Sequence, residues 1–367
     1  QAEGYQTAMI GKWHLPTKPS GFDFWAKTSG YYSAGMQSSE GKLDRSGYTV
    51  DVITDVGLDW MKNSDPEKPF AIWLSHNAVH RTWMPAADKL NHYRNDTIPE
   101  PSTLFDDYAG RSPGAAIAQM RISKDLFPAY DLKLPVTGEG ILDGAATRNL
   151  KNLSDETREA WKAAYGPGNQ AFLDANLSGD ELTSWNYQRY IKDYLRCVSS
   201  VDDSVGRVMK YLADNDLADN TIVIYSSDQG FFLGEHGWYD KRWMYEPSLR
   251  TPLIVHWPGV TDAGSTSDLM VQNIDMAPTF LQMAGMDVPS TMQGESLTPI
   301  LKGGTPKKWR DAIYYHYQQS DEGRTSHIVA KHYGIRTQRY KLIYVYEHDF
   351  WEFYDLRSDP DETHNLY

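Results

Sequence analysis

Cysteine is nearly absent from this sequence, with Cys197 the only one among 367 residues. A single cysteine cannot form an intramolecular disulfide framework or a zinc–thiolate cluster, so both of those scaffold classes are excluded. Nothing near Cys197 would activate a thiolate, and the residue lies beside an apolar helical stripe. We therefore expect it to be a small packed hydrophobe.

Positive charge is also in short supply. The chain has 36 Lys and Arg against 49 Asp and Glu, a formal net charge of -13 and a pI of about 5.3. Nucleic-acid binding needs clustered cations against the phosphate backbone, so we expect no nucleic-acid partner. No apolar run approaches the roughly 20 residues that span a bilayer, and we expect no membrane span.

What is present is an α/β pattern. Near-continuous apolar runs at Phe70–Leu74 and Thr221–Tyr225 predict strands covered on both faces. Between them, apolar residues at helical spacing predict a long helix from about Trp185 to Asp214. The stretch from Pro85 to Trp161 is rich in Pro, Gly, Asp and Asn, which predicts a long surface excursion, and such loops often carry specificity.

The C-terminal part has a different pattern. A helix at about Asp275–Met283 is followed by Gly303-Gly304-Thr305-Pro306, which marks a boundary. Beyond it, polar turns separate four strand-like runs: Ala312–Tyr317, Ile328–Thr337, Tyr340–Tyr346 and Phe350–Leu356. We expect an α/β catalytic domain over 1–304 and a small antiparallel β subdomain over 305–367.

The strongest local group of chemical residues follows the Thr221 strand. Asp228 and Gln229 offer two hard oxygen donors suited to calcium, and Gly230 lets the backbone turn away. His236, Asp240 and Lys241 come shortly after, in a loop whose cations suit an anionic ester. Taken alone, the first group also fits an Asx-type turn and the second a solvated charged loop.

Two further groups contain histidines. Lys12 and His14 lie two residues apart on a segment that should be extended, so both would face one side and combine anion binding with proton transfer. His76 and His80 follow the Phe70 strand. Their spacing would suit zinc on a helix, but the preceding strand and the following Pro85 favour a loop histidine at an active site.

In order along the chain, these groups resemble the type I sulfatases of the alkaline phosphatase superfamily. Gly11-Lys12-Trp13-His14-Leu15 is similar to the family's GKWHLG segment, with Pro16 in place of the last glycine. Ser75–Arg81 is similar to a segment that usually ends in Pro-His, although Val79 replaces the proline. Asp228-Gln229-Gly230 resembles the paired metal ligands, and Trp351–Leu356 with Asp359-Pro360 resembles the family's closing motif.

The resemblance implies an alkaline phosphatase-like mixed sheet flanked by helices and assigns roles by position. The catalytic residues would be Lys12, His14, His80 and Lys241, and Asp228 and Gln229 would bind one Ca²⁺ per chain. A finer similarity through His332–Thr337 and Arg339–Ile343, to bacterial N-acetylglucosamine-6-sulfatases, implies a sulfated carbohydrate substrate carrying 6-O-sulfated N-acetylglucosamine from glycosaminoglycan or mucin-type glycans. Candidate sugar contacts are Asp240, His332, Arg336 and His236.

The family's nucleophile is a formylglycine made from Cys or Ser. The motif does not surround Cys197, so we expect the nucleophile upstream of Gln1 and expect this chain alone to be inactive. A formylglycine-generating or anaerobic sulfatase-maturing enzyme would be a partner, and the location would be periplasmic or secreted. The alternatives are a two-metal phosphatase or phosphodiesterase of the same superfamily and a catalytically dead glycan-binding homologue.

Overall fold

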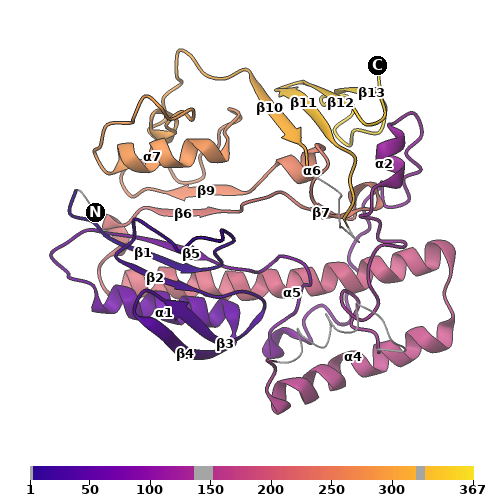
Figure 1. Ribbon diagram of the computed structural model, residues 1–367, viewed down its shortest axis with the longest axis horizontal. Coiled ribbons are helices and arrows are strands. Elements are labelled where there is room, and N and C mark those ends of the chain that lie inside the picture. Colours follow the sequence, from indigo (N-terminus) through magenta and orange to yellow (C-terminus); the bar gives the residue numbers. More distant parts are fainter. Residues whose placement is uncertain (1–2, 136–151, 320–326) are drawn as a thin grey trace. The chain divides into compact units, whose positions relative to one another are not determined.

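The computed structural model describes residues 3–135, 152–319 and 327–367 (Figure 1). These residues form two compact units. Unit 1 contains the chain up to residue 99 together with 126–216, and unit 2 contains 100–125 together with 217–367. The boundary that we expect after residue 304 falls within unit 2 and stays a prediction.

A mixed five-stranded sheet lies at the centre of unit 1. β1 pairs in parallel with β2 and β5, whereas β3 and β4 run antiparallel to their neighbours. The strands, in the order β4-β3-β2-β1-β5, are β4 (Gly41–Tyr48), β3 (Tyr32–Ser38), β2 (Phe24–Lys27), β1 (Gln6–Gly11) and β5 (Phe70–Ser75). The predicted α/β class with a mixed sheet and the Phe70 strand are confirmed, but the β3–β4 hairpin was not predicted.

Helix α1 (Thr49–Asn63) covers part of this sheet. Its Ile53 and Val56 are buried in one core cluster with Ile10 of β1, as helical spacing of apolar residues allows. Figure 1 shows α1 running beside the sheet. The face of the sheet that α1 covers is therefore buried and packed.

Helix α5 (Gly179–Asp214) begins earlier than the predicted Trp185 and ends where expected. The Ser204 hydroxyl of α5 lies 2.6 Å from the Thr54 hydroxyl of α1, which joins the two helices. Cys197 is fully buried in α5, and burial raises the pKa of its thiol to about 12. No helix in the described parts of the chain combines the length and apolar character needed to cross a membrane.

The predicted excursion between Pro85 and Trp161 has little regular structure where it is described. It contains η1 (Ala87–Lys89) and α2 (Pro113–Ile117), and α4 (Asp155–Ala175) begins before its expected end. Residues 136–151 of the excursion lie outside the described ranges. Its residues 100–125 belong to unit 2, where they hold part of the candidate site.

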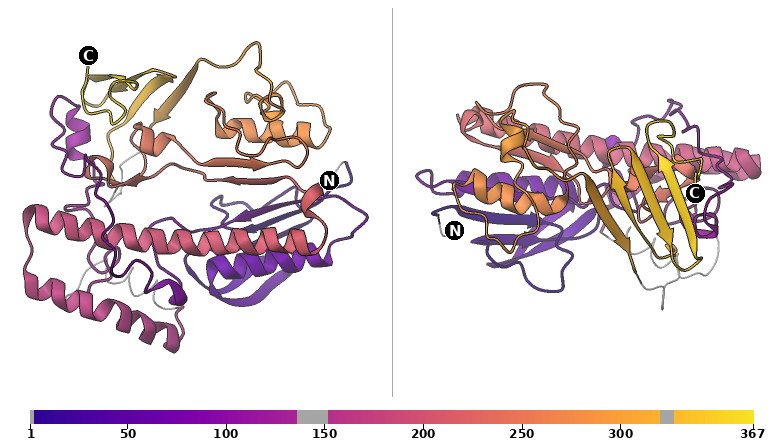
Figure 2. Two further views of the ribbon diagram at one scale, coloured as in Figure 1. Left: turned by 180° about the vertical axis from the view of Figure 1, so that it is seen from behind. Right: turned by 90° about the horizontal axis from the view of Figure 1, so that it is seen from above.

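Unit 2 contains the predicted antiparallel C-terminal sheet, whose four strands appear side by side in the right-hand view of Figure 2. Its strands are β10 (Ala312–Tyr317), β11 (His332–Thr337), β12 (Tyr340–Val345) and β13 (Phe350–Asp355). Besides α2, the other described elements of this unit are η2 (Ala218–Asn220), β6 (Val223–Ser226), β7 (Phe232–Leu233), η3 (Glu235–Gly237), β8 (Tyr239–Asp240), α6 (Glu246–Leu249), β9 (Leu253–His256), η4 (Asn273–Asp275), α7 (Met276–Met283) and α8 (Thr298–Leu301).

A buried ionic network joins α6 to the C-terminal sheet. The ammonium of Lys341 on β12 lies 2.9 Å from Glu246 Oε1 and 2.5 Å from Glu362 Oε1, and Lys341 and Glu362 are fully buried. The Glu246 amide also donates to Glu362 Oε2 at 2.6 Å. These contacts fix the start of α6, which follows directly on Lys241–Tyr245.

This network predicts a stability that depends on pH. Burial raises the pKa of Glu362 to about 7, although the Lys341 ammonium opposes the rise. An unfolded glutamate titrates near 4.3. Between about pH 4.5 and 7 the folded state therefore holds a proton that the unfolded state has released, so stability falls as pH rises through this window. In Glu362→Gln, we expect the free energy of unfolding to fall less over this pH range than in the natural protein.

The measurement is the free energy of urea unfolding at pH 5 and at pH 7.5 for the natural protein and for Glu362→Gln. Other groups titrate in both proteins, so the difference between their two pH dependences isolates Glu362. An equal loss of stability in both would show that Glu362 does not titrate in this window.

Candidate functional site

The parallel strands β1 and β5 end together at one edge of the unit 1 sheet. Gly11 pairs with Ser75, and the Lys12 amide donates to Ser75 O at 2.7 Å. A Cβ at Gly11, whose φ is +124°, would lie 2.0 Å from Ser75 O, so only glycine permits this approach. Strand β1 thus delivers Lys12 to the edge where open α/β sheets bind ligands.

Lys12 and His14 lie in the segment that follows β1, which ends at Gly11. The indole of Trp13 donates to Thr17 O at 2.8 Å and thereby fixes the loop. Lys12 is half-buried and His14 is exposed. The placement of the two side chains on one face stays a prediction, and both have exposed surface.

His80 lies in the loop that follows β5, and its side chain is exposed. Its Nδ1 is 2.9 Å from Arg81 O, and since a carbonyl only accepts, Nδ1 carries a proton and donates it. Proton exchange then takes place at Nε2. The loop is held by the Tyr31 hydroxyl, which donates to His80 O at 2.5 Å, and by a buried ion pair between Arg81 and Asp131.

His76 begins the same loop but turns inward. Its Nε2 lies 3.0 Å from the Ser204 hydroxyl of α5, and its Nδ1 is buried. Burial lowers the pKa of His76 to about 4, so the imidazole is neutral near pH 7. Its contact with α5 lets His76 hold the loop that carries His80. The two histidines bond different partners, Ser204 and Arg81.

In unit 2, Asp228 and Gln229 lie just beyond the carboxyl end of β6. A Cβ at Gly230 would lie 2.3 Å from Pro247 O, and the Gly230 amide donates to Ser248 O at 3.2 Å. The chain therefore passes tightly against the 247–250 segment at Gly230. This close passage leaves Asp228 and Gln229 exposed on the preceding turn.

The calcium that the family implies can be tested against these donors. Within the described residues, no hydrogen bond occupies the side-chain oxygens of Asp228 or Gln229. A carboxylate and an amide oxygen are the ligand types that Ca²⁺ prefers, so the pair fits as part of a site. It is incomplete by itself, because no group of three or more His, Cys, Asp and Glu residues that could hold a metal occurs in the described ranges.

Asp240 is the buried centre of a second charged group in unit 2. It forms an ion pair with Arg242, its Oδ2 lies 2.8 Å from His327 Nδ1, and its Oδ1 lies 4.0 Å from the Lys241 ammonium. Burial alone would raise the pKa of Asp240, but the His327 hydrogen bond and the nearby cations lower it well below its usual range. The carboxylate is therefore ionised.

Backbone strain accompanies this group. Asp240, Arg242 and His327 have φ values of 74°, 102° and 59°, which non-glycine residues rarely adopt. Strain of this kind tends to occur at functional sites. Sequence reasoning did not find His327, because only the fold brings it to Asp240.

The other three predicted sugar contacts, His332, His236 and Arg336, form bonds to residues of unit 2. His332 is fully buried, with Nδ1 donating to Ala330 O and Nε2 accepting from the Met244 amide. His236 is 1% exposed. Arg336 is half-buried and donates to the Glu246 carboxylate through two nitrogens. Buried in this way, His236 and His332 do not fit the predicted role of sugar contacts, and Arg336 serves the α6 network.

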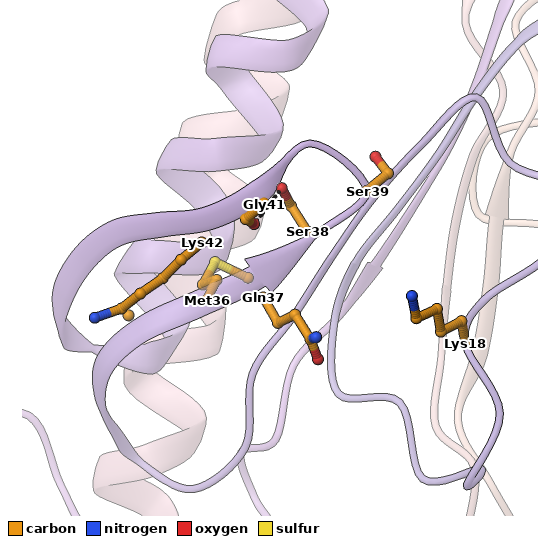
Figure 3. Close-up of a pocket in the computed structure, with 8 residues that line it drawn as sticks. Lys18, Met36, Gln37, Ser38, Ser39, Gly41 and Lys42 are labelled. Carbon is orange, nitrogen blue, oxygen red and sulfur yellow. Dashed lines mark hydrogen bonds between the residues drawn. The ribbon is translucent and has the colours of Figure 1, made fainter.

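Unit 1 also has a polar surface pocket of about 530 Å³ over the β3–β4 hairpin (Figure 3). Lys18, Gln37 and Lys42 are among its lining residues. None of the predicted catalytic or metal-binding residues lines it. The pocket is therefore distinct from the groups described above.

Two family patterns match this chain. The pattern of the family described as Sulfatase matches residues 1–286, and that of the N-sulphoglucosamine sulphohydrolase C-terminal region matches residues 234–367. The chain belongs to the sulfatase family and is a sulfuric ester hydrolase of that family.

Individual relatives are sugar sulfatases. An N-acetylglucosamine-6-O-sulfatase of Bacteroides thetaiotaomicron is 45% identical over 379 residues, which cover 100% of this chain and 67% of that protein. The N-acetylglucosamine-6-sulfatase of Homo sapiens is 28% identical over 342 residues, covering 88% of this chain and 51% of that protein. The chain thus spans about two thirds of the bacterial relative and about half of the human one.

A solved structure is similar over the whole chain. It has a TM-score of 0.94 and 44% identity, covers 100% of this chain and 76% of that one, and is described as a complex with its substrate D-glucosamine-2-N,6-O-disulfate. These matches confirm the alkaline phosphatase-like fold and place the chain among the sugar sulfatases.

Proposed function

We propose that this sugar sulfatase removes the 6-O-sulfate group from N-acetylglucosamine or glucosamine residues of glycosaminoglycan or mucin-type glycans. The observation that carries this proposal is the 45% identity, over all of this chain, to an N-acetylglucosamine-6-O-sulfatase. The similar solved structure, described with a 6-O-sulfated glucosamine as its substrate, supports the same substrate class.

Lys12 and Lys241 would neutralise the charge on the sulfuryl oxygens. Both side chains are cationic and partly exposed, and Lys12 follows a strand end that the Gly11–Ser75 contact fixes. A fixed ammonium stabilises the developing charge without reorganising during the reaction. This role does not require either lysine to lose a proton.

His80 would act as the general acid. Since Nδ1–H donates to Arg81 O, the imidazole is oriented and Nε2 is the atom that carries the proton to the departing sugar oxygen. The exposed His14 would carry the second proton of the cycle. The two histidines thus divide the acid and base steps.

The proposed reaction also needs a nucleophile and a metal ion. A formylglycine hydrate would supply the nucleophile, and Ca²⁺ would withdraw charge from the sulfuryl oxygens. Asp228 and Gln229 would hold the ion through their exposed oxygens. By the same resemblance, we propose maturation by a formylglycine-generating or anaerobic sulfatase-maturing enzyme and a periplasmic or secreted location.

Asp240 would take part in sugar recognition together with its neighbours. Its buried carboxylate holds Arg242 and His327, whose side chains are 18% and 16% exposed. These two donors reach the surface and can bond sugar hydroxyls, while Asp240 sets their direction. The ionised Asp240 carboxylate strengthens its own bonds to both side chains and so fixes them.

We expect Asp228→Asn to weaken calcium binding by on the order of 10-fold or more, because the ion loses its charged oxygen ligand. The measurement is a chelator titration of the natural protein followed by metal analysis. Asp219→Asn, a change at another exposed aspartate of unit 2, is the matched control. Equal calcium affinity in Asp228→Asn and the natural protein would remove Asp228 from the ligand set.

The proposed substrate is tested by sulfate release from glucosamine and N-acetylglucosamine sulfated at the 3, 4 or 6 position, using the natural protein. We expect the 6-O-sulfates to be hydrolysed with a kcat/KM at least about 100-fold above those of the isomers. Preference for another position would contradict the proposed substrate and leave the sulfatase class intact.

A further inference from the structure

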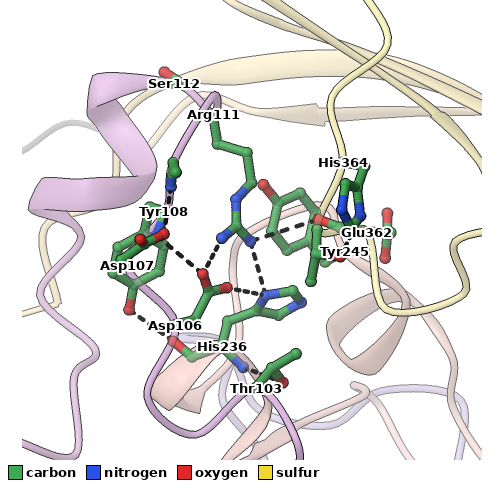
Figure 4. Close-up of polar contacts among 12 residues, drawn as sticks. Thr103, Asp106, Asp107, Tyr108, Arg111, Ser112, His236, Tyr245, Glu362 and His364 are labelled. Carbon is green, nitrogen blue, oxygen red and sulfur yellow. Dashed lines mark hydrogen bonds and ion pairs between the residues drawn. The ribbon is translucent and has the colours of Figure 1, made fainter.

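A buried charged cluster links the excursion to the turn that precedes Asp240 (Figure 4). His236 Nδ1 lies 2.8 Å from Asp106 Oδ2 and 3.0 Å from Arg111 Nη1, and Arg111 also forms an ion pair with Asp106. The three side chains are at most 7% exposed. All three lie in unit 2, and none is a family motif residue assigned to the reaction.

The protonation states follow from the contacts. Burial would raise the pKa of Asp106, but hydrogen bonds from His236 and Arg111 lower it well below its usual range. Burial lowers the pKa of His236. A neutral imidazole beside an ionised carboxylate donates its Nδ1–H to that carboxylate, and the Arg111 charge compensates Asp106.

The backbone of the turn is held by the same loop. The His236 amide donates to the Thr103 hydroxyl at 3.0 Å, and His236 O accepts from the Tyr108 hydroxyl at 2.6 Å. A Cβ at Gly237, whose φ is +64°, would lie 2.7 Å from Leu104 O. His236 is therefore bonded to the 103–111 loop through its amide, its carbonyl and its side chain.

The contacts continue to the residue before Asp240. The Ile122 amide donates to Gly237 O and the Tyr239 amide donates to Met120 O, both at 2.9 Å, and Arg121 pairs with Trp238. The excursion thus holds residues 236–239 one after another. Asp240 and Lys241, which have the proposed sugar and sulfate roles, follow immediately.

We propose that Asp106, acting through His236, is a positioning residue that fixes the placement of Asp240 and Lys241 for the sulfate ester. The inference rests on the proposed function for its kinetic consequence. His236 does not touch the substrate in this account. Its burial, which removes it from the sugar contacts, is what fits it to hold the turn.

The first test replaces Asp106 with Asn in the natural protein, which keeps the shape and removes the charge. We expect kcat to fall by about 10- to 100-fold, because a small displacement of catalytic groups has effects of that size. The matched control is Asp275→Asn. Asp275 is also buried and paired with an arginine, Arg310, in unit 2. Within the described residues, its side chain bonds Arg310 and the amides of Gln272 and Glu295, and none of these belongs to residues 236–242.

The second test compares His236→Ala with His236→Asn. The Asn amide can donate near the position of Nδ1, so we expect it to recover kcat to within about 3-fold of the natural protein, whereas Ala does not. Rescue of this kind separates positioning from loss of packing alone. Equal kcat in the two variants, or an equal loss in Asp275→Asn and Asp106→Asn, would overturn the inference.

A third measurement does not depend on activity. Amide hydrogen exchange across residues 236–242 should be faster in Asp106→Asn than in Asp275→Asn, because only the first loosens the turn. Unchanged exchange there would overturn the positioning role even in an active enzyme. If the natural protein hydrolysed no sulfate ester while Asp106→Asn still exchanged faster than Asp275→Asn, the proposed function would be wrong and the structural link would stand.

Discussion

Replacing Lys241 with alanine is expected to lower kcat/KM for a sulfated sugar by about 100- to 1,000-fold, the usual effect of removing one fixed charge that stabilises a transition state. The Lys241 ammonium lies 4.0 Å from Asp240 Oδ1 and 5.8 Å from the centre of the Phe231 ring, and its side chain is 17% exposed. The side chain is thus held in place while its charge stays accessible. Steady-state kinetics of the natural protein and the variant provide the measurement.

Lys302→Ala is the matched control for this change. Lys302 is another lysine of unit 2 with its ammonium over an aromatic ring, 6.0 Å from that of Trp257. Its loss should leave kcat/KM unchanged. If Lys241→Ala retained activity within about 3-fold of the natural protein, the sulfate-binding role of Lys241 would have to be abandoned.

The second large effect concerns stability. We expect Lys341→Met to lower the free energy of unfolding by about 3 to 5 kcal/mol, since removing one member of a buried ion network leaves an uncompensated charge. Here the ammonium is fully buried between the carboxylates of Glu246 and Glu362. Urea unfolding at pH 7.5 measures the change.

Two comparisons sharpen this prediction. Lys331→Met removes a lysine from a 2.9 Å ion pair with Glu347, just outside strands β11 and β12. Both side chains are about 30% exposed, so the loss should be below about 1 kcal/mol. The double change Lys341→Met with Glu362→Gln should restore part of the stability, because it also removes one buried carboxylate. Equal losses in the two single variants would contradict a buried charge network.

Much of the fold was predictable because local pattern and tertiary packing agree. Strand β12 was predictable from its run of aromatic and β-branched residues. Its alternation is not visible in the sequence, because Lys341 lies on the buried side with Ile343 and Val345. The long apolar stripe of α5, by contrast, is visible in the sequence. The β3–β4 hairpin was missed because its polar, glycine-rich residues become strands only by pairing beside β2.

The candidate site was predictable only in part. Asp228 follows the end of a strand that the sequence predicts, and the structure places it there. The burial of His236 and His332 was not predictable, because their partners Asp106 and Met244 are chosen by the fold. The identity of a polar residue in a motif does not show whether its side chain contacts a ligand or bonds the backbone.

The most direct test of the central claim compares glucosamine 6-sulfate with glucosamine 6-phosphate as substrates of the natural protein. A sulfatase with one calcium should hydrolyse the sulfate ester with a kcat/KM at least about 100-fold above that of the phosphate ester. Equal or higher activity on the phosphate, with two metal ions bound per chain, would contradict the account and assign the chain to a two-metal phosphatase.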